Sequence, residues 1–564
     1  MTFSDYKYER PDLELFVADF GRLMEAFAKA NTAQEQLDFL ERINRLRNSF
    51  LTMYNICYIR HSINSKDKFY ETENRFFDEN LPVYEQENSR FYKLLLDSPF
   101  RKELEQTLGT QLFALAEMSL KTFSKEIMQD LVQENRLSTE YMKVKARAQL
   151  DVDGKTYNLS SITPLEEDPN RSLRKKATDT KWAFYAENQG LIEQIYDDLV
   201  AVRTRIATQL GFENYTELGY MRMNRSDYNQ EMVAQFRTAV QKYIVPIANQ
   251  LYQKQKRRLR QDELKYYDLG FKFPSGNPKP TGSPQQIVEN TSQMYHELSK
   301  ETDEFFQFMV KGNLLDLVAK DGKSTGGYCT FIPNYGAPFI FSNFNGTSGD
   351  IVVMTHEAGH AFQVYSSRNT PLPEYQWPTY EAAEIHSMSM EFFTFPWMNL
   401  FFGEDSEKFK FAHLISAITF IPYGVAVDEF QHIVYNQPEL SPKERNQVWL
   451  DLQKKYLPHF DHAGNSFLEA GGFWQRQSHI FRSPFYYIDY ALAQICAFQF
   501  WQRDQQDHLA AWNDYVRLCQ AGGSQSFLGL VKLAGLRSPF DESVIQNIAT
   551  DIDAYLDKID DSNF

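Results

Sequence analysis

The sequence predicts a mostly α-helical protein that contains a small β-sheet. Helical periodicity covers much of the chain: from residue 12 to about 136, and again from 177 to 267, apolar residues recur every three or four positions with charged residues between them. Extended segments are few and short, and two of them, 326–332 and 338–344, are close neighbours in the chain. We therefore expect one small sheet to pack among many helices.

The length and the charge of the chain limit what kind of protein it is. A chain of 564 residues exceeds what a single hydrophobic core usually serves, so two or more subdomains are expected. The 59 basic and 75 acidic residues leave a formal charge of −16, and the basic residues form no dense block. This pattern argues against nucleic acid or an anionic membrane surface as a partner.

The expected location follows from two further features of the sequence. The N-terminal residues contain no apolar signal core, and no run of about 18 uncharged apolar residues follows. The four cysteines are far apart and form no CxxC pair, which suits a reducing compartment: Cys57, Cys329, Cys496 and Cys519. We expect a cytoplasmic protein.

The N-terminal helical region is expected to end in a β-hairpin. Between residues 141 and 162 the apolar period drops to two, beginning with Val144 to Ala148, and Asp153-Gly154 suits a two-residue hairpin turn. We therefore divide the chain into an N-terminal helical region with a hairpin at its end, 1–165, and a second region, 166–564.

A helix start and a loop follow the hairpin. Asp168-Pro169-Asn170 is typical of a helix start, and Arg171 and Arg174 after it are expected on a solvated face. The Pro/Gly-rich run 273–284 interrupts the helical pattern and predicts a loop. One more helix pair is expected over 287–318.

The segment Thr355-His356-Glu357-Ala358-Gly359-His360 indicates a function. In a helix of 3.6 residues per turn, His356 and His360 lie on one face, so a nitrogen of each can bind the same metal ion. Glu357 then lies beside the metal, where it can take a proton from a zinc-bound water that attacks a carbonyl. Chance placement of 11 His would produce this pattern in roughly one such chain in a hundred. The pattern predicts a zinc peptidase.

A second helix is expected to carry the third zinc ligand. Three prolines between residues 371 and 378 forbid one continuous helix, and a helical pattern runs from about 379 to 398. Two histidines and one carboxylate leave the fourth position of zinc open for water, as in catalytic sites. Glu381, Glu384 and Glu391 lie near one face of this helix, and their spacing alone does not choose among them.

The two extended segments, 326–332 and 338–344, come just before the zinc helix. A free strand edge offers backbone N–H and C=O groups to an extended peptide, which would fix the position of its scissile carbonyl. The alternative is that the strands only pack the site. Cys329 lies here and is expected to be a buried, unreactive small residue rather than a regulatory thiol.

Residues 479–490 combine a histidine with several tyrosines. The segment reads His479-Ile480-Phe481-Arg482-Ser483-Pro484-Phe485-Tyr486-Tyr487-Ile488-Asp489-Tyr490. Taken alone, a stretch rich in Phe and Tyr is more often part of a core than of a site.

These motifs resemble those of the M3 family of zinc metallopeptidases, the group of thimet oligopeptidase, and most closely its oligoendopeptidase F branch. In that family a HExGH helix is followed some 25 residues later by a helix whose glutamate is the third ligand. The resemblance runs from about 168 to 540, and the N-terminal 160 residues share only their helical character. Besides the two zinc helices it includes Leu210-Gly211-Phe212, Asn214-Tyr215, Phe339–Asn345 and Gly522-Gly523-Ser524.

The resemblance implies the residues of the site. By the family pattern the third ligand is Glu384, so that one zinc ion per chain is held by the two motif histidines and this glutamate. The family also carries a histidine followed by tyrosines whose hydroxyls reach the scissile carbonyl oxygen and stabilise the oxyanion. By that pattern His479 and Tyr490 are the first candidates and Tyr487 is the next, with Glu357 as general base.

The resemblance implies an architecture and a substrate class as well. Two helical lobes are expected around a deep substrate channel, with the small sheet beside the zinc helices. Such a channel excludes folded proteins. The expected activity is therefore that of a zinc-dependent oligoendopeptidase, which hydrolyses internal bonds of short unstructured peptides, and oligopeptides are the expected partners.

Two other functions are compatible with parts of the sequence. A zinc carboxypeptidase would need an arginine that binds the terminal carboxylate of the substrate, and Arg476 and Arg482 are available for this. A peptide-binding protein with a structural zinc ion would need ligands but no base, and Glu357 argues against it.

Overall fold

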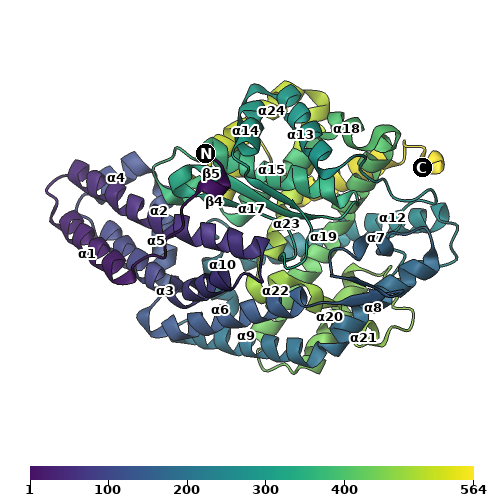
Figure 1. The fold of residues 1–564 in the computed structure, drawn as a ribbon, viewed down its shortest axis with the longest axis horizontal. Coiled ribbons are helices and arrows are strands. Elements are labelled where there is room, and N and C mark those ends of the chain that lie inside the picture. Colours follow the sequence, from purple (N-terminus) through teal and green to yellow (C-terminus); the bar gives the residue numbers. More distant parts are fainter.

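The computed structural model describes residues 1–564, apart from the side chain of Asn563, and consists mainly of α-helices (Figure 1). The N-terminal helices extend from one end of the molecule. They are α1 (Leu13–Lys29), α2 (Ala33–Ile63), α3 (Lys68–Leu96), α4 (Arg101–Leu108) and α5 (Thr110–Thr122). These helices enclose a hydrophobic core of their own, which includes Phe16, Phe50 and Phe91 and also takes in Leu372 and Tyr375 from the second region.

The next part of the chain carries a hairpin and a series of helices. In chain order the elements are α6 (Met128–Ala146), β1 (Leu150–Val152), β2 (Lys155–Tyr157), α7 (Thr163–Glu166), α8 (Arg171–Glu187), α9 (Gln189–Gln209), α10 (Tyr215–Arg222), α11 (Gln230–Ala239), α12 (Val245–Arg258), α13 (Pro284–Leu298) and α14 (Lys300–Lys311). Residues 259–283 between α12 and α13 contain the predicted Pro/Gly-rich loop.

The main sheet has three strands: β3 (Leu315–Val318), β4 (Tyr328–Ile332) and β5 (Ala337–Phe344). Their order is β3-β5-β4, with β3 parallel and β4 antiparallel to the central strand β5. Cys329 of β4 pairs with Ile340 of β5. β4 is therefore an edge strand, as the sequence predicted for one of the two extended segments.

The helices that follow the sheet build the centre of the molecule. They are α15 (Gly349–Ser367), α16 (Pro373–Gln376), α17 (Tyr380–Phe393), α18 (Asn399–Phe402), α19 (Ser406–Asn436), α20 (Pro442–Tyr456), α21 (Ser466–Glu469), α22 (Ser478–Arg482), α23 (Tyr487–Gln506), α24 (His508–Ala521), α25 (Phe527–Leu533) and α26 (Glu542–Leu556). Helix α17 packs against α15 and α23, and α23 packs against α19. The two helices with the zinc-ligand candidates are thus in direct contact.

The helices form two lobes (Figure 1). Helices α13, α14, α15 and α24 lie in the upper part of the view, whereas α6, α8, α9 and α20 lie in the lower part. Helices α17, α19 and α23 lie between these two groups. The predicted fold class, mostly α in two lobes with a small sheet beside the candidate zinc helices, is confirmed.

The predicted hairpin forms, but it is shorter than the period of two suggested. Asp153 and Gly154 both have positive φ, 56° and 78°, as a two-residue turn of this type requires. Val144, however, belongs to α6, where it is buried near Tyr141, one helical turn away. Packing of this helical face overrides the local alternation of apolar and polar residues.

Two other local predictions were wrong. The helix pair expected over 287–318 ends at Lys311, because Asn313 turns the chain with a φ of 50° and the next residues pair with β5 as β3. The prediction of a solvated face at the start of α8 fails for Arg174, which is buried with Nη2 2.9 Å from the fully buried carboxylate of Asp268. Arg171 also binds Asp268, with Nη2 2.6 Å from the carboxylate, but 40% of its side chain is exposed, as expected.

One helix of the described residues is long and apolar enough to cross a membrane by length and composition alone. It is the segment Asn399–Asn436, which contains α19, and 83% of its most apolar window is buried inside the protein. Core helices of proteins outside membranes pass the same test, and this one packs against α12, α20 and α23.

Candidate metal centre and active site

Helix α15 begins directly after the sheet, and its first turn is tied to the preceding loop. The carboxylate of Asp350 accepts hydrogen bonds from the backbone N–H groups of Asn345 and Gly346, at 2.9 and 2.8 Å. A carboxylate in the first turn is also favoured by the helix dipole. This contact fixes the start of the helix that carries His356, Glu357 and His360.

Gly359 allows α15 and α17 to approach each other closely. A Cβ at this position would lie 2.6 Å from Cα of Ser387 and 2.8 Å from the carbonyl oxygen of His386, both on α17. No side chain larger than hydrogen fits without moving one of the helices. The glycine between the two motif histidines thus permits the approach of α17, which carries Glu384.

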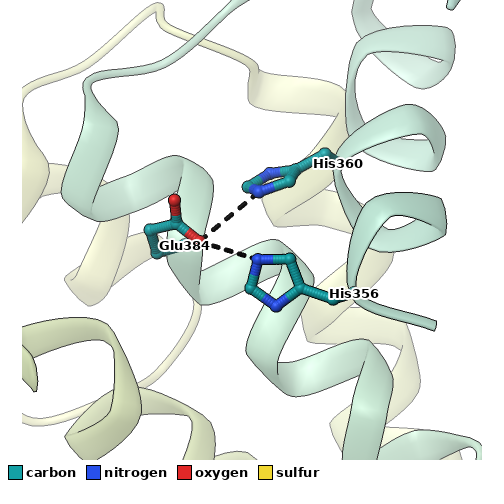
Figure 2. Close-up of side chains that lie close together, drawn as sticks. All are labelled: His356, His360 and Glu384. Carbon is teal, nitrogen blue, oxygen red and sulfur yellow. Dashed lines mark ion pairs between the residues drawn. The ribbon is translucent and has the colours of Figure 1, made fainter. Parts of the chain in front are cut away.

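His356, His360 and Glu384 meet at one point (Figure 2). Oε2 of Glu384 lies 3.2 Å from Nε2 of His356 and 3.4 Å from Nε2 of His360. The carboxylate is almost fully buried. Burial alone would raise its pKa. The two histidines outweigh burial and hold the pKa of Glu384 well below its usual value. The three side chains form a group that could hold a metal ion.

A ring of further contacts surrounds this group. Nδ1 of His356 lies 2.6 Å from Oε1 of Glu391, whose other oxygen lies 2.6 Å from Nε2 of His413. Glu384 accepts hydrogen bonds from the hydroxyls of Ser387 and Tyr486. Side chains that are held in this way keep their orientation toward the metal position.

Glu357 lies beside this group without joining it. Its side chain is buried, and Oε2 has no hydrogen-bond partner within the part of the chain that the structure describes. Burial raises the pKa of this carboxyl group. A Cβ built on Gly327, just before β4, would lie 3.4 Å from Oε1 of Glu357, so the edge strand begins next to this carboxylate.

His479 and the tyrosines of the predicted second cluster lie together at the N-terminus of α23. Nε2 of His479 lies 3.3 Å from the hydroxyl oxygen of Tyr490, and the ring of Tyr487 is 5.0 Å from that of His479. Burial raises the pKa of Tyr487 and of Tyr490 well above the usual value, so both hydroxyls keep their protons at neutral pH. The hydroxyl of Tyr486 instead bonds to Glu384.

A cavity of about 350 Å³ lies beside both clusters. Its lining includes Glu391 and His413, which surround the metal-binding group, and His479, Tyr487 and Tyr490 of the second cluster. Much of the remaining wall is apolar, from the side chains of Val352, Met388, Phe409, Ala412, Ala417 and Phe420. A cavity with an apolar wall and a few polar groups is the usual form of a substrate site.

The comparison with known families decides the class of the protein. Residues 164–550 match the model described as peptidase family M3, and residues 3–123 match the model described as peptidase M3 N-terminal domain.

The chain belongs to peptidase family M3.

Curated relatives of this M3 peptidase are oligoendopeptidase F homologues. One from Borreliella burgdorferi is 23% identical over 390 residues, which cover 67% of this chain and 64% of that protein. One from Mycoplasma genitalium is 20% identical over 411 residues, which cover 68% of this chain and 65% of that protein. The chain therefore spans slightly less than two thirds of the length of these relatives.

Solved structures match the M3 chain over its whole length. PZ peptidase A is 54% identical, covers 100% of both chains and has a TM-score of 0.99. A structure from Bacillus anthracis is 53% identical, covers 100% of this chain and 99% of that one, and has a TM-score of 0.94. Oligoendopeptidase F from Enterococcus faecium is 13% identical with a TM-score of 0.63, which shows a shared fold. The predicted resemblance to the oligoendopeptidase F branch is confirmed.

The structure separates the three glutamates that the sequence left open on α17 of this M3 peptidase. Glu384 lies against the two histidines, Glu391 bonds to the outer nitrogen of His356, and Glu381 makes no ion pair or hydrogen bond with either histidine. Glu381 is fully buried, and neither of its carboxylate oxygens has a hydrogen-bond partner among the described residues. Burial, together with the nearby charge of Asp489, raises its pKa well above the usual value.

Sequence reasoning missed several residues around the M3 site. His413 on α19 contacts Glu391 only through the tertiary fold, and no local spacing marks it. Gln477 lies two residues before His479 and bonds to its ring, but a glutamine at this spacing is not a signal of a site.

Cys329 lies partly exposed on β4. Desolvation of its thiol, followed by the charge of Glu357, raises its pKa well above the usual value. The thiol is therefore protonated at neutral pH, in line with the expected lack of reactivity.

Proposed function

We propose that this M3 peptidase is a zinc-dependent oligoendopeptidase, which hydrolyses internal bonds of short unstructured peptides in the cytoplasm. The observation that carries the proposal is the convergence of two imidazole nitrogens and one carboxylate oxygen beside an unpaired, buried glutamate. Ligands without such a base would suit a structural ion, whereas a buried base beside an open metal site suits hydrolysis.

The donor set fits one zinc ion per chain. Two ligand atoms of a tetrahedral zinc site, each about 2.0–2.1 Å from the ion, are roughly 3.3–3.4 Å apart. Oε2 of Glu384 lies 3.2 and 3.4 Å from Nε2 of His356 and of His360, close to that separation. When bound there, zinc would lower the pKa of a water molecule to about 7 and polarise the scissile carbonyl.

Glu357 acts as the general base in this proposal. Its free Oε2 atom takes a proton from the attacking water and later delivers it to the leaving amine. Burial raises the pKa of the carboxyl group, which makes it a better proton acceptor than an exposed glutamate. A buried carboxylate that is paired with neither an arginine nor a lysine would be costly without such a use.

His479 and Tyr490 stabilise the oxyanion, and Tyr487 is a further candidate. All three line the cavity and retain polar hydrogens at neutral pH. Donors that are fixed in place before the reaction stabilise negative charge as it develops on the carbonyl oxygen. Tyr486 has a different role, because its hydroxyl already bonds to Glu384 and so orients a zinc ligand.

The surroundings of the site support an endopeptidase that acts on extended chains. The edge strand β4 begins beside Glu357 and offers backbone groups to a peptide, and the apolar cavity wall suits an apolar side chain of that peptide. Neither Arg476 nor Arg482 is among the described residues that line this cavity. The arginine that a carboxypeptidase would use is therefore not supported at these positions.

A peptide blocked at both ends tests the activity. We expect the zinc-loaded enzyme to cleave an acetylated and amidated peptide of about ten residues, and a chelator to stop the reaction until zinc is restored. Mass spectrometry of the products gives the cleaved bond. Stepwise loss of C-terminal residues from the free peptide, with no cleavage of the blocked one, would show a carboxypeptidase instead.

A further inference from the structure

Three side chains in a row support His479, and none of them has a role in the proposed mechanism. Its Nδ1 atom lies 2.7 Å from Nε2 of Gln477, and Oε1 of Gln477 accepts a hydrogen bond of 2.8 Å from the hydroxyl of Tyr423. The guanidinium of Arg476 lies beside Tyr423, with its central carbon 5.4 Å from the ring centroid.

The directions of these hydrogen bonds follow from the chemistry of the groups. The hydroxyl of Tyr423 donates to Oε1 of Gln477, and the neighbouring guanidinium of Arg476, which only donates, offers that hydroxyl no other acceptor. The amide oxygen of Gln477 therefore faces Tyr423, and the amide NH₂ group faces His479. Because an amide nitrogen cannot accept a hydrogen bond, Nδ1 of His479 must present its lone pair.

The backbone around Gln477 is fixed as well. The hydroxyl of Tyr141 donates to the carbonyl oxygen of Gln475 at 2.9 Å, and Nζ of Lys145 bonds to the carbonyl oxygen of Arg476 and to Oγ of Ser478. Both Tyr141 and Lys145 belong to α6, in the other region of the chain. The amide of Gln477 thus has a rigid support, as an orienting contact requires.

The proton of the His479 ring is then on Nε2. Burial lowers the pKa of this histidine to about 4, so the ring is neutral at pH 7 and carries one proton. With Nδ1 occupied by the Gln477 amide, Nε2–H donates to the oxygen of Tyr490 at 3.3 Å. Since that oxygen accepts, the hydroxyl proton of Tyr490 remains free for another acceptor.

We propose that Gln477, oriented by Tyr423, is a positioning residue that holds His479 in its Nε2–H tautomer, so that the hydroxyl proton of Tyr490 stays free for the oxyanion and Nε2–H of His479 remains a donor beside it. In the opposite tautomer Nε2 would accept a hydrogen bond from Tyr490, and one contact would remove both donors from the site. The inference rests on the proposed function, in which these two residues stabilise the oxyanion.

The tautomer can be measured without any assay of activity. In the zinc-loaded enzyme with ¹⁵N-labelled histidines, imidazole ¹⁵N–¹H correlation spectra distinguish Nε2–H from Nδ1–H, and the His479→Gln variant identifies the His479 signals. We expect the Nε2–H form near pH 7.5. A wild-type ring protonated on Nδ1 would overturn the inference, whether or not any variant folds.

Substitutions at Gln477 test the consequence for catalysis. A carboxylate in Gln477→Glu only accepts, so it should move the ring proton to Nδ1 and lower kcat at pH 8 by about 10–100-fold, the usual effect of an outer contact, with KM within about threefold. As the pH falls, the carboxylate lets the ring take a second proton, both nitrogens then donate, and kcat should partly recover. Gln447→Glu, on the exposed face of α20, is the matched control.

The outcomes separate this inference from the proposed function. If His479→Gln keeps normal kcat, the role of His479 in the proposed function is wrong. If His479 is required but Gln477→Glu retains the Nε2–H form and normal activity at pH 8, the role of Gln477 is wrong. Tyr423→Phe, which frees the Gln477 amide to rotate, should give a mixture of the two tautomers, and an unchanged single tautomer would show that Tyr423 does not orient it.

Discussion

Oε1 of Glu391 lies 2.6 Å from Nδ1 of His356, on the side of the ring opposite to the nitrogen that faces Glu384. The contact places the ring proton on Nδ1 and leaves the lone pair of Nε2 for a metal ion. The other motif histidine differs, because Nδ1 of His360 is buried without a hydrogen-bond partner among the described residues. The orientation of the metal site therefore depends more on His356 and its carboxylate partner.

Removal of Glu391 should weaken zinc binding without abolishing it. We expect Glu391→Ala to lower zinc affinity by about 10–100-fold, the usual effect of losing such a partner. Glu391→Gln should lose less, because an amide oxygen still accepts from Nδ1 of His356. Competition with a chelator of known affinity measures the change, and Glu407→Ala on the exposed start of α19 is the control. Equal affinity of Glu391→Ala and wild type would contradict the prediction.

The assignment of the third ligand predicts a difference between two neighbouring glutamates. Glu384→Ala should release zinc, because it removes the oxygen that lies between the two histidine nitrogens. Glu381→Ala should keep zinc, since that side chain is not part of the group around the metal position and lies near the charge of Asp489 instead. Metal analysis after gel filtration checks both variants. If Glu381→Ala lost zinc and Glu384→Ala kept it, the third ligand would be Glu381, one helical turn earlier.

The role of Glu357 predicts a loss of rate with an intact metal site. Glu357→Gln should keep zinc and lose about 10²–10⁴-fold in kcat, the usual contribution of a general base. The amide is nearly the same size as the carboxylate, so the buried position should not be disturbed. Steady-state rates and zinc content are measured on the same sample. Near-normal turnover of a zinc-loaded variant would rule out this mechanism.

The low pKa of His479 predicts that the stability of the folded protein depends on pH. Burial lowers its pKa to about 4 from a usual value of 6.5, despite the nearby carboxylate of Glu384, and Arg482 and Lys145 act in the same direction as burial. Between pH 6.5 and 4 the unfolded chain binds a proton that the folded protein does not bind, so folding becomes less favourable as the pH falls.

This contribution is present above pH 6.5 and is lost as the pH falls toward 4. We expect His479→Gln, which does not titrate, to lose less stability over this range than wild type, by on the order of 1–3 kcal/mol. Urea unfolding at several pH values measures the difference. Parallel curves for the two proteins would show that His479 titrates normally.

Local sequence patterns predicted the structure correctly where a single helix or turn determined it. The spacing of His356 and His360 placed both on one face of α15, and Asp153-Gly154 formed the expected turn. Local patterns failed where a distant partner decided. Arg174 was expected to be solvated because Asp268, which binds it in the buried interior, lies almost a hundred residues away in the sequence.

The same limit applies to the candidate site. Spacing did not distinguish Glu384 from Glu381 and Glu391, since one helical turn separates the first two and all three lie near one face. Packing of α17 against α15 and α23 makes the distinction in the structure. Contacts between helices, such as that of His413 on α19 with Glu391, carry no local signal in a single sequence.

The last prediction concerns the size of the substrate. The edge of β4 begins beside Glu357, and the cavity next to the metal position has a volume of only about 350 Å³. An unfolded peptide can add to such an edge and place an apolar side chain in the cavity. A folded domain has its backbone already paired and must unfold locally before it can do the same.

Access rather than recognition of particular side chains should therefore select the substrate. One good cleavage sequence can be placed in a short peptide, in a long disordered chain and in an exposed loop of a stable domain, and kcat/KM compared. We expect efficient cleavage of the short peptide, much slower cleavage of the long chain and none of the folded loop. A destabilised variant of the same domain is the matched control, because cleavage should return in proportion to its unfolded fraction. Equal rates for all three substrates would require an open groove, in which neither the cavity nor the strand edge restricts access.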